Sequence, residues 1–178
     1  PPRALFVSGW YECSFPAALA DFEAIAARSA ERGGAAPELL LGPWAAAPLP
    51  RAERARGTRD IAVIARALLR FAAHAVGARA TRDMPARVFV RGAGWREAVR
   101  WPPAASCERT LYLRGEGRAN SSAGDGRLAE EPGEDRADTF VADPADPVPS
   151  LGGAAVAGVA GAGDQRLVED RGDVLCFT

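Results

Sequence analysis

The sequence of 178 residues contains no lysine, so all 22 of its basic side chains are arginines. Without lysine the chain has no side-chain amine that could act as a nucleophile or form a Schiff base with a carbonyl substrate. Its single histidine leaves little room for a metal site built from imidazole ligands. We therefore expect neither a metal nor another cofactor.

Cysteine is also scarce, and its spacing excludes two further kinds of site. Cys13, Cys107 and Cys176 are odd in number, lie far apart and form no C-x-x-C pair. This pattern indicates neither a disulfide framework nor a zinc knuckle. It fits a reducing compartment best, and we expect the protein to be cytoplasmic.

The chain has no excess of either charge and no long apolar run. Its formal net charge is -1, which provides no electrostatic attraction toward nucleic acid or an anionic membrane. No apolar run approaches the roughly 18 residues that a membrane helix needs. We therefore expect neither of these partners. The content of 48% hydrophobic and 25% charged residues is that of an ordinary folded protein.

The first part of the sequence alternates strand and helix patterns. Residues 4–9 and 38–44 are short apolar runs that end in turn residues, which is typical of buried strands. Residues 15–32 and 58–76 carry apolar side chains at spacings of three and four, which predicts helices. Two successive strand–helix units indicate a parallel sheet with helices on its faces.

After about residue 80 the pattern becomes that of β-structure. Residues 87–92 and 109–114 predict short strands, and the tail 173–178 resembles another strand. Short strands separated by turn clusters favour a sandwich or barrel. The predicted fold class is therefore α/β followed by all-β. The glycine- and alanine-rich residues 152–163 lack the lysine of a phosphate-binding loop, so we interpret them as a flexible surface loop.

Short sequence strings, which occur in a fixed order along nearly the whole chain, carry a resemblance to a known family. They are Gly9-Trp10-Tyr11-Glu12, Leu41-Gly42-Pro43-Trp44, Arg87-Val88-Phe89-Val90-Arg91-Gly92, Trp95-Arg96, Trp101-Pro102-Pro103, Leu111-Tyr112-Leu113-Arg114, Gly117-Arg118-Ala119-Asn120-Ser121, Asp143-Pro144-Ala145-Asp146-Pro147-Val148-Pro149 and Gly152-Gly153. Together they resemble the cocaine-esterase and Xaa-Pro dipeptidyl-peptidase family of serine hydrolases.

This resemblance implies a division of the chain into two domains. Residues 1–80 would be the end of an α/β-hydrolase domain, and residues 81–178 would be most of a C-terminal, galactose-binding-like jelly-roll β-sandwich. The chain would then be truncated at both ends, with the nucleophilic serine and the cap upstream of Pro1. No G-x-S-x-G motif is present in the sequence. A small ester or peptide substrate would bind through the missing upstream domain, and the protein could be a homo-oligomer.

The resemblance also assigns two triad positions. In the family, the carboxylate that orients the base is an aspartate directly after Gly-Trp-Tyr, and this position is Glu12. Some α/β hydrolases use glutamate here; the alternative is a partly exposed glutamate at a strand end. The family places its histidine base two residues after Gly-Pro-Trp, where this chain has Ala46. Loss of a triad member costs several powers of ten in rate, so we expect the chain to be inactive alone.

The leading interpretation is a C-terminal part of a serine hydrolase that acts on acyl esters or prolyl peptides. The alternative is a non-catalytic jelly-roll binding or interaction module of a degenerate family member.

Other chemistry-bearing residues have simpler interpretations. His74, the only histidine, lies in the helix predicted over 58–76, and a surface or structural role is favoured over a relocated base. The acidic pairs Glu130-Glu131 and Glu134-Asp135 lie among Pro and Gly, which indicates a solvated loop. Tryptophans that could line an acyl pocket, or alternatively pack at a domain seam, are Trp10, Trp44, Trp95 and Trp101.

Overall fold

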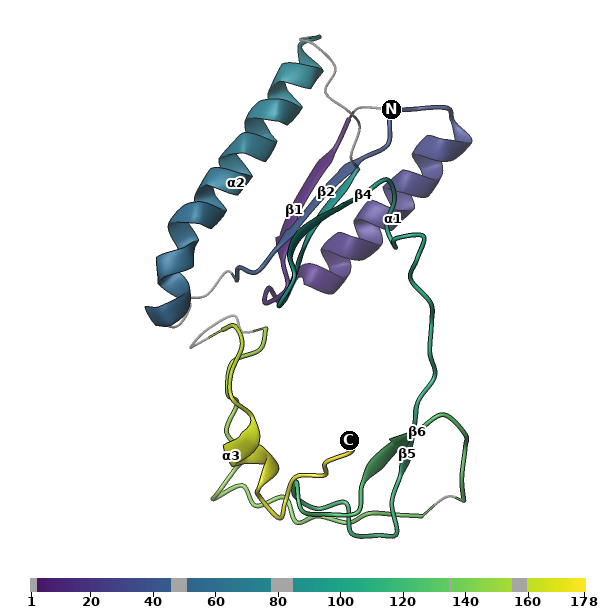
Figure 1. Ribbon diagram of the computed structural model, residues 1–178, viewed down its shortest axis with the longest axis vertical. Helices are drawn as coiled ribbons and strands as arrows, with labels where there is room; N and C mark the ends of the chain where they lie inside the picture. The colour runs from purple at the N-terminus through teal and green to yellow at the C-terminus, as the bar shows by residue number, and fades with distance from the viewer. Residues whose placement is uncertain (1–2, 46–50, 78–84, 135, 155–159) are drawn as a thin grey trace. The chain divides into compact units, whose positions relative to one another are not determined.

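The computed structural model describes residues 3–45, 51–77, 85–134, 136–154 and 160–178 (Figure 1). The chain divides into two compact units. Unit 1 comprises Pro1–Ser106 with Gly152–Gly161, and unit 2 comprises Cys107–Leu151 with Ala162–Thr178. Among the described helices, none is both long enough and apolar enough to cross a membrane.

Unit 1 contains a four-stranded mixed sheet and two long helices (Figure 1). Its elements in chain order are β1 (Leu5–Gly9), α1 (Phe15–Glu31), β2 (Glu38–Gly42), α2 (Arg51–Ala75), β3 (Ala86–Val90) and β4 (Gly94–Ala98). The strand order is β1-β2-β3-β4, with β1, β2 and β3 parallel and β4 antiparallel to β3. The α/β expectation for the first part is confirmed at this level.

The central strand β2 is covered on both faces, which explains its unbroken apolar sequence. Leu39, Leu40 and Leu41 are 3%, 2% and 0% exposed, although successive side chains of a strand point to opposite faces. Helices α1 and α2 lie on opposite sides of the sheet (Figure 1). On the α1 side, Phe22 packs with Leu39 and Leu41 in the main core cluster.

Helix α1 begins and ends nearly as the sequence predicts. Its last turn closes with the amide of Gly33 donating to Ala30 (3.3 Å) and that of Gly34 donating to Ser29 (2.8 Å). Gly33 has a φ of +60°, which glycine adopts without a steric penalty. Helix α2 starts at Arg51, earlier than the predicted residue 58. Residues 51–57 have no apolar stripe but consist mainly of the strong helix formers Ala, Arg and Glu.

The boundary between the units lies later than the predicted residue 80. β3 pairs in parallel with β2, and β4 pairs with β3, so both strands extend the sheet of unit 1. The prediction assigned residues 87–92 to the second domain because no helical pattern follows them. β3 is followed by a tight turn, in which the amide of Ala93 donates to the Val90 carbonyl (3.0 Å), and by the hairpin strand β4. The division into two domains at residue 80 stays a prediction.

Unit 2 has fewer regular elements. Its described residues contain the antiparallel pair β5 (Tyr112–Arg114) and β6 (Arg127–Ala129) and the short helix α3 (Arg166–Glu169). The tail predicted as a strand makes one isolated bridge, Leu175 with Asn120. Strands are thus present in this half, while its jelly-roll assignment stays a prediction.

Polar contacts of one asparagine and one arginine connect distant segments of unit 2. The Asn120 side-chain amide donates to the carbonyls of Thr139 (2.8 Å) and Gly172 (3.0 Å). The Arg171 guanidinium pairs with Asp173 (2.7 Å) and Asp146 (3.2 Å). These contacts fix loops that regular hydrogen-bond ladders do not hold.

The first prediction concerns Gly42, at the end of β2. A Cβ at this position would overlap the indole ring of Trp44. We expect Gly42→Ala to lower the free energy of unfolding of unit 1 by about 1–3 kcal/mol. Urea unfolding followed by tryptophan fluorescence measures this change. Val99→Ile, which adds a methylene at a position 68% exposed, is the control and should have little effect. Equal stability of G42A and the wild type would contradict the packing described.

The second prediction concerns the acid stability of unit 2. The hydrogen bond from Arg171 lowers the pKa of Asp173. A lowered folded-state pKa contributes stability above the unfolded value of about 3.9, and that stability is lost as pH falls through the folded pKa. The urea midpoint of unit 2, followed by the Cys176 amide NMR signal, should therefore drop below about pH 4.

Asp173→Asn should make this acid dependence weaker. Asp164→Asn is the matched control, because the pKa of Asp164 is also lowered by an arginine two residues away, Arg166. Arg171 in addition pairs with Asp146, 25 residues away in sequence, so D164N should change the acid dependence less than D173N does. The same acid dependence in D173N and the wild type would contradict the role of the pair.

Candidate active site

The candidate site lies where β1 and β2 end. These parallel strands finish at Gly9 and Gly42, which are partners in the register. Ligands of open α/β sheets bind outside the carboxyl ends of the strands, because the loops that follow parallel strands meet there. The segments after the two glycines contain both triad positions that the sequence predicts, Glu12 and Ala46.

Backbone hydrogen bonds hold the two loops together beyond the strand ends. The amide of Trp10 donates to the Gly42 carbonyl (3.0 Å), and the amide of Tyr11 donates to the Trp44 carbonyl (3.3 Å). Trp44 lies directly against both strand-end glycines, since a Cβ on Gly9 would overlap its carbonyl oxygen and a Cβ on Gly42 would overlap its ring. Glycine at both positions is therefore what permits this approach.

Glu12 follows β1 in a tight turn that leads into α1. Its amide donates to the Gly9 carbonyl (3.1 Å), and its carbonyl accepts from the amide of Phe15 (3.1 Å). The carboxylate oxygen Oε2 accepts a hydrogen bond from the hydroxyl of Ser8 (3.0 Å). Glu12 is half-buried, whereas Ser8 is only 2% exposed. The side chain of Glu12 is thus tied back to β1 and does not extend freely into solvent.

The predicted base position, Ala46, lies outside the described residues. Ala45 is the last described residue of this loop and directly follows Trp44, whose carbonyl accepts a hydrogen bond from the amide of Tyr11. The structure therefore places the beginning of the second loop beside the Glu12 loop. The assignment of Ala46 to the base position stays a prediction.

His74 lies at the other end of unit 1. Its Nδ1 accepts a hydrogen bond from the guanidinium of Arg3, which precedes β1 (2.7 Å). Glu12, by contrast, follows β1. Helix α2 starts on the loop after β2, and at 1.5 Å per residue His74 lies about 35 Å further along the helix axis. This placement agrees with a structural or surface role and argues against a relocated base.

The four tryptophans separate into two pairs, and all of them belong to unit 1. Trp44 and Trp95 contact each other with ring centroids 5.9 Å apart, and Arg87 lies 5.2 Å from the Trp95 centroid. Trp10 and Trp101 pack against the core on the α1 side. The Trp10 indole also donates to the Phe89 carbonyl (2.7 Å), which fixes the Glu12 loop to β3. These contacts show packing within one unit, and an acyl pocket and a domain seam stay the two predictions for the tryptophans.

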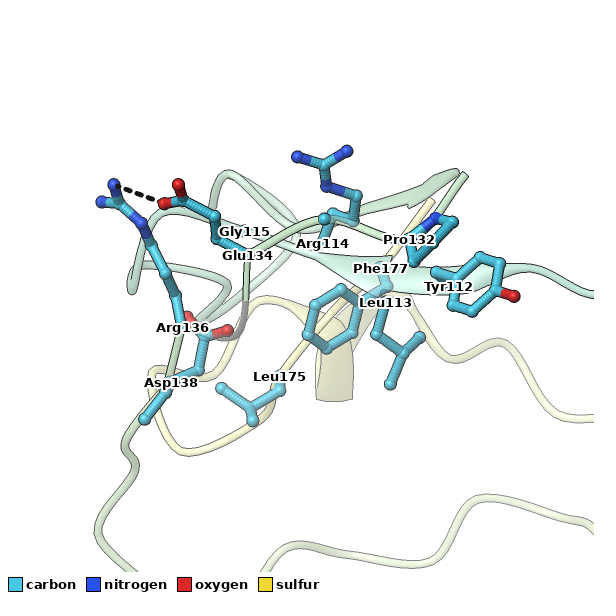
Figure 2. A pocket seen from close by; sticks show the side chains of 12 residues that line it. Tyr112, Leu113, Arg114, Gly115, Pro132, Glu134, Arg136, Asp138, Leu175 and Phe177 are labelled. Atoms are coloured by element: carbon cyan, nitrogen blue, oxygen red, sulfur yellow. Dashed lines mark ion pairs between the residues drawn. The ribbon is translucent and has the colours of Figure 1, made fainter. Parts of the chain in front are cut away.

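Unit 2 contains a groove of about 730 Å³ (Figure 2). Leu113, Leu175 and Phe177 form its apolar side, and the ion pair of Arg136 with Glu134 lies at another side (Figure 2). Within the described part of the chain, no three His, Cys, Asp or Glu residues come together as metal ligands would.

Two of the cysteines are exposed and one is not. Cys13, next to Glu12, and Cys107 are exposed. Burial raises the pKa of the Cys176 thiol, with a smaller contribution from the negative charges of Glu169 and Asp170. The half-buried Cys176 thiol donates a hydrogen bond to the Glu169 carbonyl (3.5 Å).

Sequence reasoning missed Ser8 as a member of the site. The residue lies inside a strand pattern, where a small polar side chain carries no functional signal. Its spacing of four from Glu12 becomes meaningful only through the turn that folds Glu12 back over the end of β1.

Comparison with known proteins supports the resemblance read from the sequence strings. No protein-family model matches the chain. The chain is 36% identical, over 187 aligned residues, to the cocaine esterase of Rhodococcus sp. (strain MB1 Bresler). The alignment covers 98% of the chain and 32% of that esterase, so the chain spans about a third of the length of the curated relative it matches.

Proposed function

We propose that this chain is the part of a serine hydrolase that supplies the acidic triad position and the end of the hydrolase sheet. The substrate class is an acyl ester or a prolyl amide, and the chain by itself does not hydrolyse it. The observation that carries the proposal is the position of Glu12, held directly after β1 beside the loop that follows β2. The similarity to an esterase over almost the whole chain supports it.

The chemistry explains why both loops matter. In a serine hydrolase the serine oxygen attacks the substrate carbonyl carbon while an imidazole accepts the hydroxyl proton. The imidazolium then gives a proton to the leaving group, and a carboxylate orients the ring and stabilises its charge. Glu12 can act as this carboxylate. The methyl side chain of alanine at position 46 cannot accept a proton, so the base must come from elsewhere or be lost.

Unpaired surfaces of unit 1 favour its place within a larger hydrolase domain. β1 stands at the end of the sheet order, and within the described part of the chain no strand pairs with its other edge. The neighbouring helix α2 exposes Ile61 and Leu69 at 68% and 70%. Open edges and exposed apolar side chains of this kind are normally covered by further structure.

Exposed apolar side chains also support the jelly-roll assignment of unit 2. Leu113, on β5, is 67% exposed and lines the groove of Figure 2. A two-stranded sheet is marginal alone, and three or more strands with an apolar face are needed for independent stability. We propose that β5 and β6 belong to a larger β-sandwich.

A non-catalytic binding module is the second candidate. It is favoured by the polar connections of Asn120 and Arg171, which hold unit 2 together, and by the missing imidazole at position 46. In that case the groove of unit 2 would be the binding site, and Glu12 would have no catalytic role.

A fluorophosphonate probe tests the proposed inactivity. Such probes bond to serines that a base has activated. We expect no labelling of the 178-residue chain, because position 46 has no base. Intact-mass measurement after incubation checks this, with the Rhodococcus esterase as the positive control. Covalent labelling of any serine of the chain would refute the inactivity.

The alignment of Ala46 with the base position can be tested in a chimera. Residues 1–178 replace the matching third of the Rhodococcus esterase, and ester hydrolysis is measured with and without Ala46→His. Removing a triad member costs roughly 10⁴- to 10⁶-fold in kcat, so restoring the imidazole should raise kcat by at least about 10³-fold.

Neighbouring positions provide the control for this experiment. Ala45→His adds the same ring one residue away and should leave the chimera inactive. Glu12→Gln in the A46H chimera should remove most of the gain. An inactive A46H chimera that is correctly folded would contradict the proposed function.

A further inference from the structure

We propose that Ser8 is a positioning residue that fixes Glu12 for contact with a base. This inference rests on the proposed function, because it gives Glu12 the role of the triad carboxylate. Ser8 itself would touch neither substrate nor base. It acts through the hydrogen bond from its hydroxyl to Glu12 Oε2 (3.0 Å).

The burial of Ser8 shows that its hydroxyl needs this partner. Ser8 is 2% exposed and is the register partner of Leu41, a core residue that is 0% exposed. A buried hydroxyl without a hydrogen bond costs free energy, so such groups are almost always paired. In the described structure the partner of the Ser8 hydroxyl is Glu12.

The longer side chain of glutamate gives the hydrogen bond a specific purpose. Compared with aspartate, glutamate has one more rotatable bond, and a carboxylate that samples several rotamers orients an imidazole poorly. The hydrogen-bonded strand holds the backbone of Ser8, and burial restricts its side chain, so its hydroxyl provides an anchor for the carboxylate. Anchoring Oε2 at this point limits the rotation of the carboxylate.

One oxygen of the carboxylate remains for the base. Within the described part of the chain, the Glu12 carboxylate accepts a side-chain hydrogen bond at Oε2 and none at Oε1. A carboxylate accepts with both oxygens, so Oε1 can accept the N–H of an imidazole while Oε2 stays bound to Ser8. Oε2 therefore anchors the carboxylate to Ser8, and Oε1 contacts the base.

The direct test measures the rotamers of Glu12 in the 178-residue chain. Three-bond scalar couplings across its side-chain bonds distinguish a single rotamer from an average. We expect a single rotamer in the wild type and averaged couplings in Ser8→Ala. Averaged couplings in the wild type would overturn the proposal, whatever the variants show.

Other serines provide matched controls. Ser29→Ala removes a hydroxyl that is equally buried, at 3% exposure, but lies on α1. Ser14→Ala removes an exposed hydroxyl close to Glu12 that makes no helix-capping hydrogen bond. Both should leave the Glu12 couplings unchanged. Ser8→Cys keeps the volume with a weaker donor and should give an intermediate result, which covers the case that S8A fails to fold.

An activity measurement separates this proposal from the proposed function. In an active A46H chimera, Ser8→Ala should lower kcat about 10- to 100-fold with little change in KM, because orientation and not substrate binding is lost. Unchanged kcat would overturn the positioning role and leave the proposed function intact. An inactive A46H chimera would contradict the proposed function, and the couplings would still decide whether Ser8 fixes Glu12.

Discussion

The parallel pairing of β1 with β2 is the constraint on which the candidate site depends. The register brings both strands to an end at the same level, with Gly9 opposite Gly42. The loops that leave this pair are joined by the amides of Trp10 and Tyr11, and Trp44 occupies the space that two Cβ atoms would otherwise fill. A shift of one residue in this register would separate the loops and turn the core side chains toward the other face.

The α1 face of the sheet is packed more completely than the α2 face. Helix α1 buries Phe22 against Leu39 and Leu41, and the indole of Trp10 is fixed to the Phe89 carbonyl. The Glu12 loop is therefore attached to a well-packed layer. On the opposite side Leu40 is only 2% exposed, but α2 exposes several of its own apolar residues, which is the pattern of an incompletely covered face.

Unit 2 is held together in a different way. Its described residues form few ladder hydrogen bonds, and Asn120 and Arg171 connect loops that are distant in sequence. Such contacts depend on charge and on satisfied donors more than on buried apolar area. A unit of this kind is expected to respond to pH and to gain from further packing partners.

Much of unit 1 could be predicted from local patterns. Apolar runs identified β1 and β2, and spacings of three and four identified α1, because these features depend on near neighbours in sequence. The assignment of β3 and β4 could not be made this way. A strand of five residues looks the same whether it extends one sheet or begins another domain, and only the pairing of β3 with β2 decides the matter.

In the candidate site, too, some residues could be predicted from contiguous sequence, and others depend on tertiary contacts. The Gly-Trp-Tyr and Gly-Pro-Trp strings are contiguous in the chain, so the family resemblance could assign triad positions to Glu12 and Ala46 from the sequence alone, and this assignment stays a prediction. The sequence could not show that Ser8 is the hydrogen-bond partner of Glu12. It also could not show how far His74 lies from Glu12. Both decisions depend on distances in space: a turn folds Glu12 back onto Ser8, and a helix of 25 residues carries His74 away. Tertiary structure decides them because hydrogen bonds act over a few ångströms, and sequence separation does not measure that distance.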